Sequence, residues 1–271
     1  TVPCLVTGPS GLGKSAAMAK FVTEYEQDHQ DVLVIPHFIG ASPASTGLRQ
    51  MLHRFCSILK REFAFEEDIP PDTNSLSSLF RQLITQVPED RRVLFVLDAL
   101  NQLDETDNAH ALNWLPRKLP SHVKLIASCI DDPDRDEAVL EAFRQRDKHK
   151  LKIEPLTDAE RTAIVQQVPS LSAKTLDEEV QIGLLLANPA TENPLFLLVA
   201  LEELRGFGSF EYLDHRIAQF PRPHEDEPRW QRWLMDARED AQRLKDEKKR
   251  LDRLTRLDAI ESRLESTHPV N

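Results

Sequence analysis

One short motif constrains the fold of this chain more than any other part of its sequence. Residues 8–15 read GPSGLGKS, which matches the phosphate-binding pattern G-x-x-x-x-G-K-[ST] at every fixed position. An apolar segment at residues 3–6 precedes the motif, and Met18, Val22 and Tyr25 follow it at helical spacing. A strand, a glycine-rich loop and a helix in this order predict an α/β fold that holds a polyphosphate at the loop.

The residues of this loop have distinct chemical roles. Glycines let the backbone point several N–H groups at phosphate oxygens, and the N-terminus of the following helix favours negative charge there. We expect Lys14 to reach the β- and γ-phosphates and the Ser15 hydroxyl to ligate Mg²⁺. The predicted cofactors are therefore ATP or ADP together with Mg²⁺. The cofactor-binding residues predicted in the loop are Gly8, Pro9, Ser10, Gly11, Leu12, Gly13, Lys14, Ser15 and Ala16.

A carboxylate at the end of a second buried strand completes the expected metal site. Residues 93–97 are consecutively apolar and end at Asp98. On its own, an Asp at this place would also suit a turn cap. Beside a phosphate-binding loop it predicts a Mg²⁺ carboxylate. Lys14 and Asp98 are therefore predicted catalytic residues, and Ser15 and Asp98 are the predicted metal ligands.

Strand and helix patterns alternate over the first part of the chain. The strand candidates are residues 3–6, 32–39, 93–97, 123–127 and 151–153. This alternation predicts an α/β fold with a five-stranded parallel sheet covered by helices on both faces. In the class of phosphate-loop proteins with an extra strand, the strand after the acidic one is inserted between the two motif strands. Here that strand is 123–127.

Ser128 follows directly after this inserted strand. A hydroxyl at that place is expected to contact the γ-phosphate or the attacking water and to report hydrolysis, so Ser128 is the third predicted catalytic residue. The alternative is a serine that only ends a strand.

The catalytic base is the least defined part of the predicted site. Hydrolysis benefits from a carboxylate that orients or deprotonates water. Asp98 is followed by Ala99, and the next polar pair, Asn101 and Gln102, accepts protons poorly. Glu105, on the loop that follows, is the predicted base. The alternative is that Glu105 is only a solvated loop residue. We therefore expect a nucleoside triphosphatase whose hydrolysis of ATP is slow.

The pattern changes after Pro155, where strand candidates end and helical patterns continue. We predict a P-loop core at residues 1–155 and a small helical domain at residues 156–221. The last stretch, residues 222–271, carries as many acidic as basic side chains, so the whole net charge belongs to the residues before it. Its spacing predicts a charged amphipathic helix or a short, irregular coiled coil.

Composition excludes several classes of protein. The chain has 271 residues, 40% of them hydrophobic, which is too many for a wholly disordered chain. A net charge of −11 disfavours a nucleic-acid partner, and no apolar stretch reaches the roughly 20 residues of a membrane helix. Cys4, Cys56 and Cys129 lie inside apolar segments, which predicts core residues in a reducing compartment, the cytoplasm. Because the chain begins at Thr1, we expect a piece of a longer protein.

Several segments together resemble one protein family. Besides the phosphate loop, they are residues 37–46 (HFIGASPAST), 97–103 (LDALNQL), 114–116 (WLP), 193–197 (NPLFL) and 202–208 (EELRGFG). With these segments the chain is similar to STAND-class P-loop NTPases of the NACHT-like group, which includes telomerase-associated protein and nephrocystin relatives. The resemblance spans roughly residues 1–221 and leaves out the tail.

The resemblance implies a molecular switch in a larger signalling protein. Such a switch holds ADP while closed, exchanges it for ATP when triggered, and then self-associates and presents its other domains. A proline of the helical domain packs near the adenine in this family, and Pro194 matches that position, although Pro194 also suits the first position of a helix. Asn101-Gln102 replaces the acidic pair of the family, and Cys129-Ile130 stands where an arginine is usual. Both departures affect the expected rate of hydrolysis rather than binding, and the winged-helix segment of the family is not evident.

Three other functions compete with the switch. The first is a nucleotide-dependent scaffold that binds without hydrolysing and assembles through residues 222–271. The second is an AAA+ ATPase acting on DNA, which has the same strand order but fits the acidic charge poorly. The third is a small-molecule kinase, for which Arg144 and Arg146 would have to form a lid.

Overall fold

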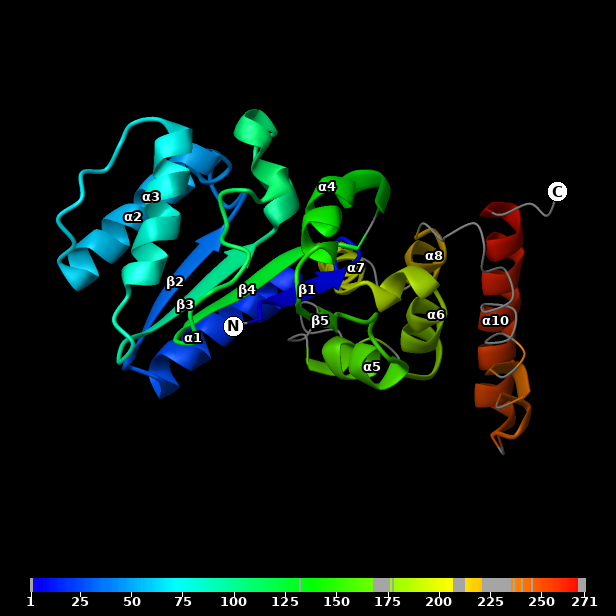
Figure 1. The fold of residues 1–271 in the computed structure, drawn as a ribbon. Coiled ribbons are helices and arrows are strands. Elements are labelled where there is room, and N and C mark those ends of the chain that lie inside the picture. The colour runs from blue at the N-terminus through cyan, green and yellow to red at the C-terminus, as the bar shows by residue number, and fades with distance from the viewer. Residues whose placement is uncertain are drawn as a thin grey trace. The chain divides into compact units, whose positions relative to one another are not determined.

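The computed structural model describes residues 2–131, 133–167, 176, 178–206, 213–220, 235, 237–239, 241–244 and 246–267 (Figure 1). The chain divides into two compact units, Thr1–Glu154 and Pro155–Asn271, and each unit is described by itself. The first unit ends one residue before the boundary predicted at residue 155. The family segment 202–208 is described only as far as Gly206, because 207 and 208 lie outside the described residues.

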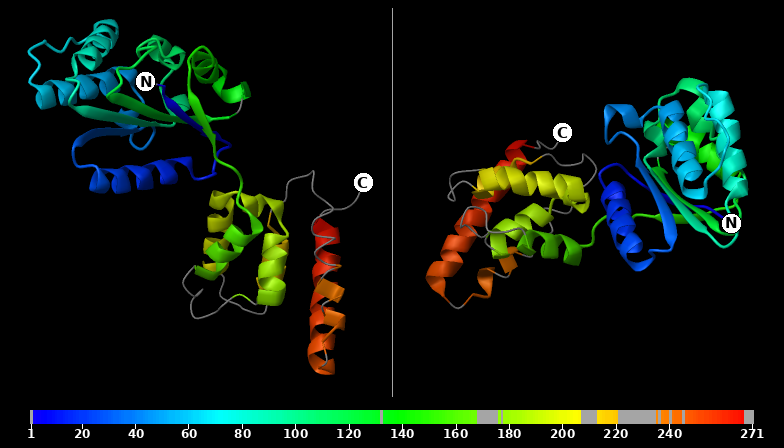
Figure 2. Two further views of the ribbon diagram at one scale, coloured as in Figure 1. Left: turned by 60° about the horizontal axis from the view of Figure 1, so that its bottom comes forward. Right: turned by 90° about the vertical axis from the view of Figure 1, so that its left-hand side faces the viewer.

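A parallel five-stranded sheet forms the centre of the first unit. Its strands are β1 (Cys4–Gly8), β2 (Val32–Phe38), β3 (Arg92–Asp98), β4 (Val123–Ile130) and β5 (His149–Lys152), and their order in space is β2-β3-β4-β1-β5 (Figures 1 and 2). β4 thus lies between β1, which carries the glycine-rich loop, and β3, which carries Asp98. This arrangement confirms the predicted α/β fold with an inserted strand.

Helices cover both faces of this sheet, as predicted. They are α1 (Lys14–Asp28), α2 (Leu48–Phe63), α3 (Thr73–Gln86) and α4 (Pro133–Arg144). The alternation of side chains along β3 decides which helix each residue meets. Leu94 and Val96 pack with Met18 and Val22 of α1, whereas Phe95 and Leu97 belong to the core beneath the other three helices.

The larger core is built around aromatic side chains. Phe95 of β3 has its ring centroid 5.4 Å from Phe55 of α2 and 5.5 Å from Phe80 of α3, in edge-to-face arrangements that aromatic pairs favour. Cys56 and Cys129 are buried in the same core, and burial raises the pKa of the Cys56 thiol to about 12. Cys4 is only half-buried. Cys56 and Cys129 therefore take the core role predicted for them.

Short 3₁₀ helices follow two of the strands at their carboxyl ends. η1 (Pro43–Ser45) comes after β2, and η2 (Leu100–Gln102) and η3 (Thr106–Ala111) come after β3. β5 begins earlier than the predicted 151–153, and all four of its residues are exposed. The apolar pattern located β5 poorly because this strand is at the edge of the sheet and carries Lys150 and Lys152.

Helices make up the second unit, and no strand occurs among its described residues. The elements are α5 (Asp158–Gln167), a π-helix η4 (Glu178–Ile182), α6 (Gly183–Leu186), η5 (Pro189–Glu192), α7 (Pro194–Gly206), α8 (Leu213–Ala218) and α10 (Glu247–Thr267). None of the helices that the structure describes is both long and apolar enough to cross a membrane.

α10 packs on the helices before it. Ile260 is buried in the core of the helical unit, and Arg256 donates to Asp214 of α8 at 3.0 and 3.2 Å. Asp214 also accepts from Gln181 of η4 at 2.9 Å, so one carboxylate joins three helical elements. Part of the predicted tail therefore shares the core of the second unit.

Candidate nucleotide-binding site

The glycine-rich loop connects the end of β1 to the first residue of α1. Gly11 and Gly13 have φ angles of 83° and 82°, in the left-handed region that costs glycine little and other residues about 1 kcal/mol or more. Gly8 is required for a different reason, because a Cβ there would lie 2.9 Å from the Ile153 carbonyl oxygen. The Ile153 N–H in turn donates to the carbonyl of Thr7 at 2.7 Å, which holds the chain after β5 against the base of the loop.

Lys14 lies over its own loop. Its ammonium donates to the carbonyl oxygens of Gly8 at 2.7 Å and Pro9 at 2.8 Å. Ser15 and Ala16, in the first turn of α1, are exposed. Ser15 and Ala16 are therefore accessible to a ligand, and the phosphate contacts of Lys14 and the loop stay predictions.

Asp98 and Ser128 form a buried pair near the carboxyl ends of β3 and β4. Ser128 was predicted to follow its strand, but β4 runs to Ile130 and Ser128 lies inside it, because the strand continues to pair with β1 through Ile130. Asp98 is 3% exposed and Ser128 is fully buried. The Ser128 hydroxyl donates to Asp98 Oδ1 at 2.5 Å, and Ser128 Oγ accepts the N–H of Ala99 at 2.7 Å. Ala99 has φ 57°, so this bond also stabilises an unfavourable backbone conformation. The structure thus brings two predicted site residues into direct contact.

The segments after β2 and β3 dock on each other. The Asp104 N–H donates to the Thr46 carbonyl at 2.9 Å, and the Thr46 hydroxyl donates to Asp104 Oδ2 at 3.2 Å. Gly40 has φ 82°, and a Cβ there would lie 1.8 Å from Gln102 Oε1. The sequence identified both segments through the family resemblance, but nothing in it indicated that Thr46 and Asp104 touch.

Glu105, the predicted base, is exposed at the start of η3. No hydrogen bond or ion pair joins it to Lys14, Asp98 or Ser128 within the described part of the first unit. The role of Glu105 as a base stays a prediction.

Pro194 belongs to the second unit, where it is the first residue of α7. Asn193 caps this helix, with its Oδ1 accepting the N–H groups of Leu195 at 3.0 Å and Phe196 at 3.3 Å. The segment before it is fixed by the buried Arg161, which donates to Thr191 at 2.6 Å. Pro194 therefore starts a helix, and its contact with a nucleotide stays a prediction.

The donor set of the site fits Mg²⁺. Ser15 offers a hydroxyl and Asp98 a carboxylate, which are the hard oxygen ligands that Mg²⁺ prefers. No group of three or more His, Cys, Asp or Glu side chains able to hold a metal occurs among the residues that the structure describes. A site with only a few protein ligands suits Mg²⁺, because this ion keeps several waters and binds phosphate oxygens of the nucleotide.

Comparisons with known proteins found similar sequences and a similar solved structure. A TPR repeat-containing protein of Dictyostelium discoideum is 28% identical in an alignment of 251 positions that covers 79% of this chain and 15% of that protein. Telomerase protein component 1 of Mus musculus is 24% identical in an alignment of 228 positions that covers 80% of this chain and 9% of that protein. The solved structure of the Aeropyrum pernix Orc1 protein in complex with DNA aligns with 98% of this chain and 78% of its own, at 14% identity and a TM-score of 0.45.

The family assignment comes from the sequence profile of the NACHT domain, which matches residues 2–172. This match confirms the predicted resemblance and runs from β1 through β5 into the helical unit. Because the profile covers more than half of the chain, the chain belongs to the NACHT domain family and has its nucleotide-binding P-loop fold.

Proposed function

We propose that this chain is an ATP-binding switch domain that hydrolyses ATP slowly. Support comes above all from the placement of β4 between β1 and β3, which sets the Asp98–Ser128 pair at the same sheet edge as the glycine-rich loop. In this proposal residues 8–16 hold the phosphates of ATP or ADP through backbone N–H groups, and Pro194 packs near the adenine.

The residues of the loop and the buried pair divide the chemistry between them. Lys14 leaves the carbonyls of Gly8 and Pro9 and donates to the β- and γ-phosphates instead. Ser15 and Asp98 hold Mg²⁺, which when bound neutralises charge on the same phosphates. Ser128 keeps one oxygen of Asp98 hydrogen-bonded, so the other oxygen is left for the metal or its waters. Glu105 orients or deprotonates the attacking water.

Three measurements test the proposal. Nucleotide extracted from the purified protein should be ADP, and calorimetry should give micromolar binding of ATP only when Mg²⁺ is present. Phosphate release should exceed that of buffer and fall in Asp98→Asn and Glu105→Gln. An empty purified protein that binds neither ATP nor ADP would contradict the switch.

A nucleotide-dependent scaffold is the second candidate, and the exposed position of Glu105 favours it. A scaffold binds ATP with the same residues but releases no phosphate above background. Its self-association, measured by light scattering, should depend on ATP and on residues 222–271. The two candidates therefore differ in turnover and agree in binding.

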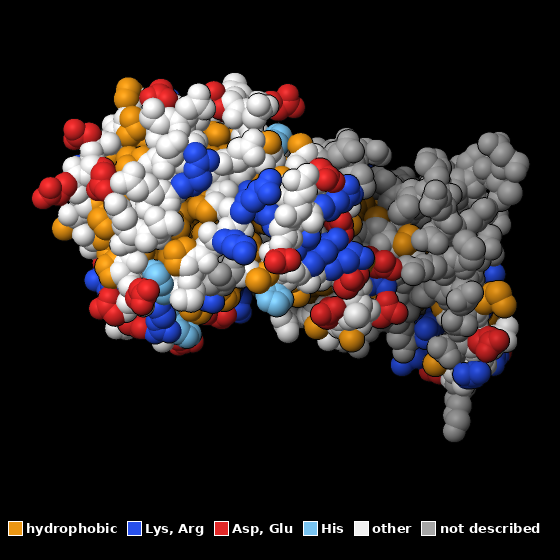
Figure 3. All heavy atoms as spheres, in the orientation of Figure 1, with side chains coloured by type: hydrophobic (Ala, Val, Ile, Leu, Met, Phe, Trp, Pro, Cys, Tyr) orange, Lys and Arg blue, Asp and Glu red, His pale blue; other side chains and the backbone are white. Residues whose placement is uncertain are grey.

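We propose no nucleic-acid partner. On the face drawn in Figure 3, several Lys and Arg side chains gather near the middle, and Asp and Glu side chains lie beside some of them. At the edge strand β5, Lys150 pairs with Asp131 at 3.2 Å and Lys152 with Glu154 at 3.4 Å. Salt-sensitive binding to duplex DNA would contradict this part and favour an AAA+ ATPase. The cytoplasm is the proposed compartment, because all three cysteines are free thiols.

A further inference from the structure

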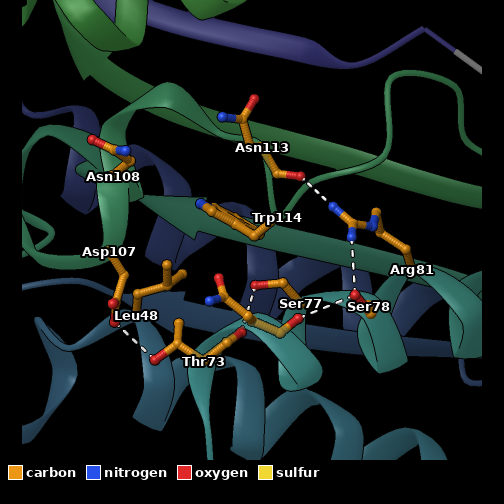
Figure 4. A pocket seen from close by; sticks show the side chains of 10 residues that line it. Leu48, Thr73, Ser77, Ser78, Arg81, Asp107, Asn108, Asn113 and Trp114 are labelled. Atoms are coloured by element: carbon orange, nitrogen blue, oxygen red, sulfur yellow. Dashed lines mark hydrogen bonds between the residues drawn. The ribbon is translucent and has the colours of Figure 1, made fainter.

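A pocket of about 280 Å³ lies on the first unit between α3 and the segment that follows β3 (Figure 4). None of residues 8–16 lines it, so it is separate from the nucleotide loop. Its lining is mainly neutral and polar, with one cation and one carboxylate. The lining residues are Leu48, Thr73, Asn74, Ser77, Ser78, Arg81, Asp107, Asn108, Asn113 and Trp114.

The backbone on one side of this pocket is strained. Asp107, Asn108 and Leu112 have φ angles of 56°, 50° and 52°, which non-glycine residues rarely adopt. Each such residue costs on the order of 1 kcal/mol or more, and such strain gathers at sites that bind ligands. The strained backbone directs the side chains of Asp107 and Asn108 to the pocket.

Three hydrogen bonds hold this strained segment in place. The Thr73 hydroxyl donates to Asp107 Oδ2 at 2.7 Å, and Arg81 Nη1 donates to the Asn113 carbonyl at 2.6 Å (Figure 4). The buried Trp114 donates from Nε1 to the carbonyl of Ala109 at 2.9 Å. The pocket is therefore a fixed feature of the first unit rather than a gap between loops.

The hydroxyl groups of the lining are poor donors to a ligand, because their protons are already used. Thr73 donates to Asp107, Ser77 to the Thr73 carbonyl at 2.8 Å and Ser78 to the Asn74 carbonyl at 3.1 Å. The hydroxyls would therefore offer an inorganic anion no proton, and the Asp107 carboxylate would repel it. The lining therefore disfavours a free phosphate.

Arg81 keeps most of its hydrogen-bonding capacity. A guanidinium has five N–H groups, and Arg81 uses one on the Asn113 carbonyl and one on Ser78 Oγ at 3.2 Å. The planar fork that remains matches a carboxylate. Asn74, Asn108 and Asn113 also line the pocket, and each carries a carboxamide with a donor and an acceptor that mirror those of a peptide group.

We propose that this pocket binds a short peptide segment that carries an acidic residue. The carboxylate of that residue pairs with Arg81, and the carboxamides of the three asparagines bond the flanking peptide groups. Asp107 Oδ1 accepts a main-chain N–H of the same segment. The pocket, at about 280 Å³, is just smaller than the roughly 300 Å³ at which drug-sized sites begin. We therefore expect it to hold a small ligand, of the size of one residue with its two peptide groups.

The test uses N-acetyl-glutamate N-methylamide as the probe, because it contains one acidic residue between two peptide groups. Titrated into the ¹⁵N-labelled chain, it should shift the side-chain amide resonances of Asn74, Asn108 and Asn113. Arg81→Lys, which keeps the charge and a donor to Asn113 but loses the fork, should weaken binding about tenfold. Asn74→Ala should weaken it less.

The controls separate this site from the nucleotide loop and from general charge. Arg61→Lys, at an exposed position of α2, should leave the affinity unchanged, and so should Lys14→Ala. The neutral N-acetyl-glutamine N-methylamide should bind more weakly. The proposal is overturned if the probe shifts none of these resonances or if Arg81→Lys binds the probe like the wild type. It is also overturned if the probe has no effect and the resonances are shifted instead by methyl glucoside, a neutral polar ligand, or by inorganic phosphate.

Discussion

The two halves of the nucleotide site differ in how they are built. The glycine-rich loop is open, and Ser15 and Ala16 are exposed beside it. The Asp98–Ser128 pair is buried, and the Ser128 hydroxyl both donates to Asp98 Oδ1 and accepts from the Ala99 N–H. An open half can lose a side chain without harm to the fold, whereas a buried polar pair cannot. Substitutions in the open half should therefore change the affinity for nucleotide alone, whereas substitutions in the buried half should also lower the free energy of unfolding.

The largest effect is expected in the open half. Lys14→Ala removes charge-assisted hydrogen bonds to the phosphates, each worth about 1.5–3 kcal/mol, so the affinity for Mg²⁺·ATP should fall about a hundredfold. The midpoint of thermal unfolding without nucleotide should change little, because Lys14 is not buried in the core and its ammonium donates to two carbonyls of the loop itself. Calorimetry and thermal scans measure the two quantities. Lys20→Ala, an exposed position on α1, is the control, and full affinity in Lys14→Ala would refute a phosphate contact.

Ser128→Ala should affect both quantities. The substitution leaves Asp98 Oδ1 and the Ala99 N–H buried without their partner, which costs about 2 kcal/mol of unfolding free energy. Binding of Mg²⁺·ATP should weaken about tenfold, and binding of ADP without Mg²⁺ should change less. Urea unfolding and calorimetry test this expectation. If stability and Mg²⁺ dependence are both unaltered, the Ser128 hydroxyl contributes neither to folding nor to the metal site.

Thr7→Val tests a second buried hydroxyl near the site, which belongs to β1 and directly precedes the glycine-rich loop. The Thr7 hydroxyl is fully buried and has no hydrogen-bond partner, in contrast to Ser128. Replacing it by a methyl group removes an unsatisfied group, so the unfolding free energy should stay the same or rise by up to about 1 kcal/mol. Urea unfolding beside Ser128→Ala is the measurement. A loss as large as that of Ser128→Ala would mean that the two hydroxyls are equivalent.

The smallest effect is expected between the segments after β2 and β3. Thr46→Val removes an exposed hydrogen bond to Asp104, which should cost about 0.5 kcal/mol of unfolding free energy. The main-chain bond between the same residues remains. ATP affinity should therefore stay within twofold of wild type. A larger loss of ATP affinity would show that this contact supports the nucleotide site.

The sequence predicted the parts of the site that depend on local chemistry. The loop at 8–15 is a contiguous motif, and Asp98 and Ser128 each end an apolar run, so strand order alone was enough to bring them together. The contact between Thr46 and Asp104 joins residues far apart in the chain, and no periodicity reports such a pair. The sequence did not predict the pocket at Arg81 for the same reason, because its walls come from α3 and from the segment after β3. The residues of that segment with a left-handed backbone are not glycines, so nothing in the sequence marks them.

The bond between Ile153 and Thr7 links the loop to the exit of the first unit. The first unit ends at Glu154, and Ile153 is the residue before that end. Its N–H donates to the carbonyl of Thr7, which directly precedes Gly8. The chain after β5 and the start of the glycine-rich loop therefore share one main-chain hydrogen bond inside the first unit. A substitution that shifts the backbone at Gly8 should consequently also disturb the last two residues of that unit, although they lie far from the loop in the sequence.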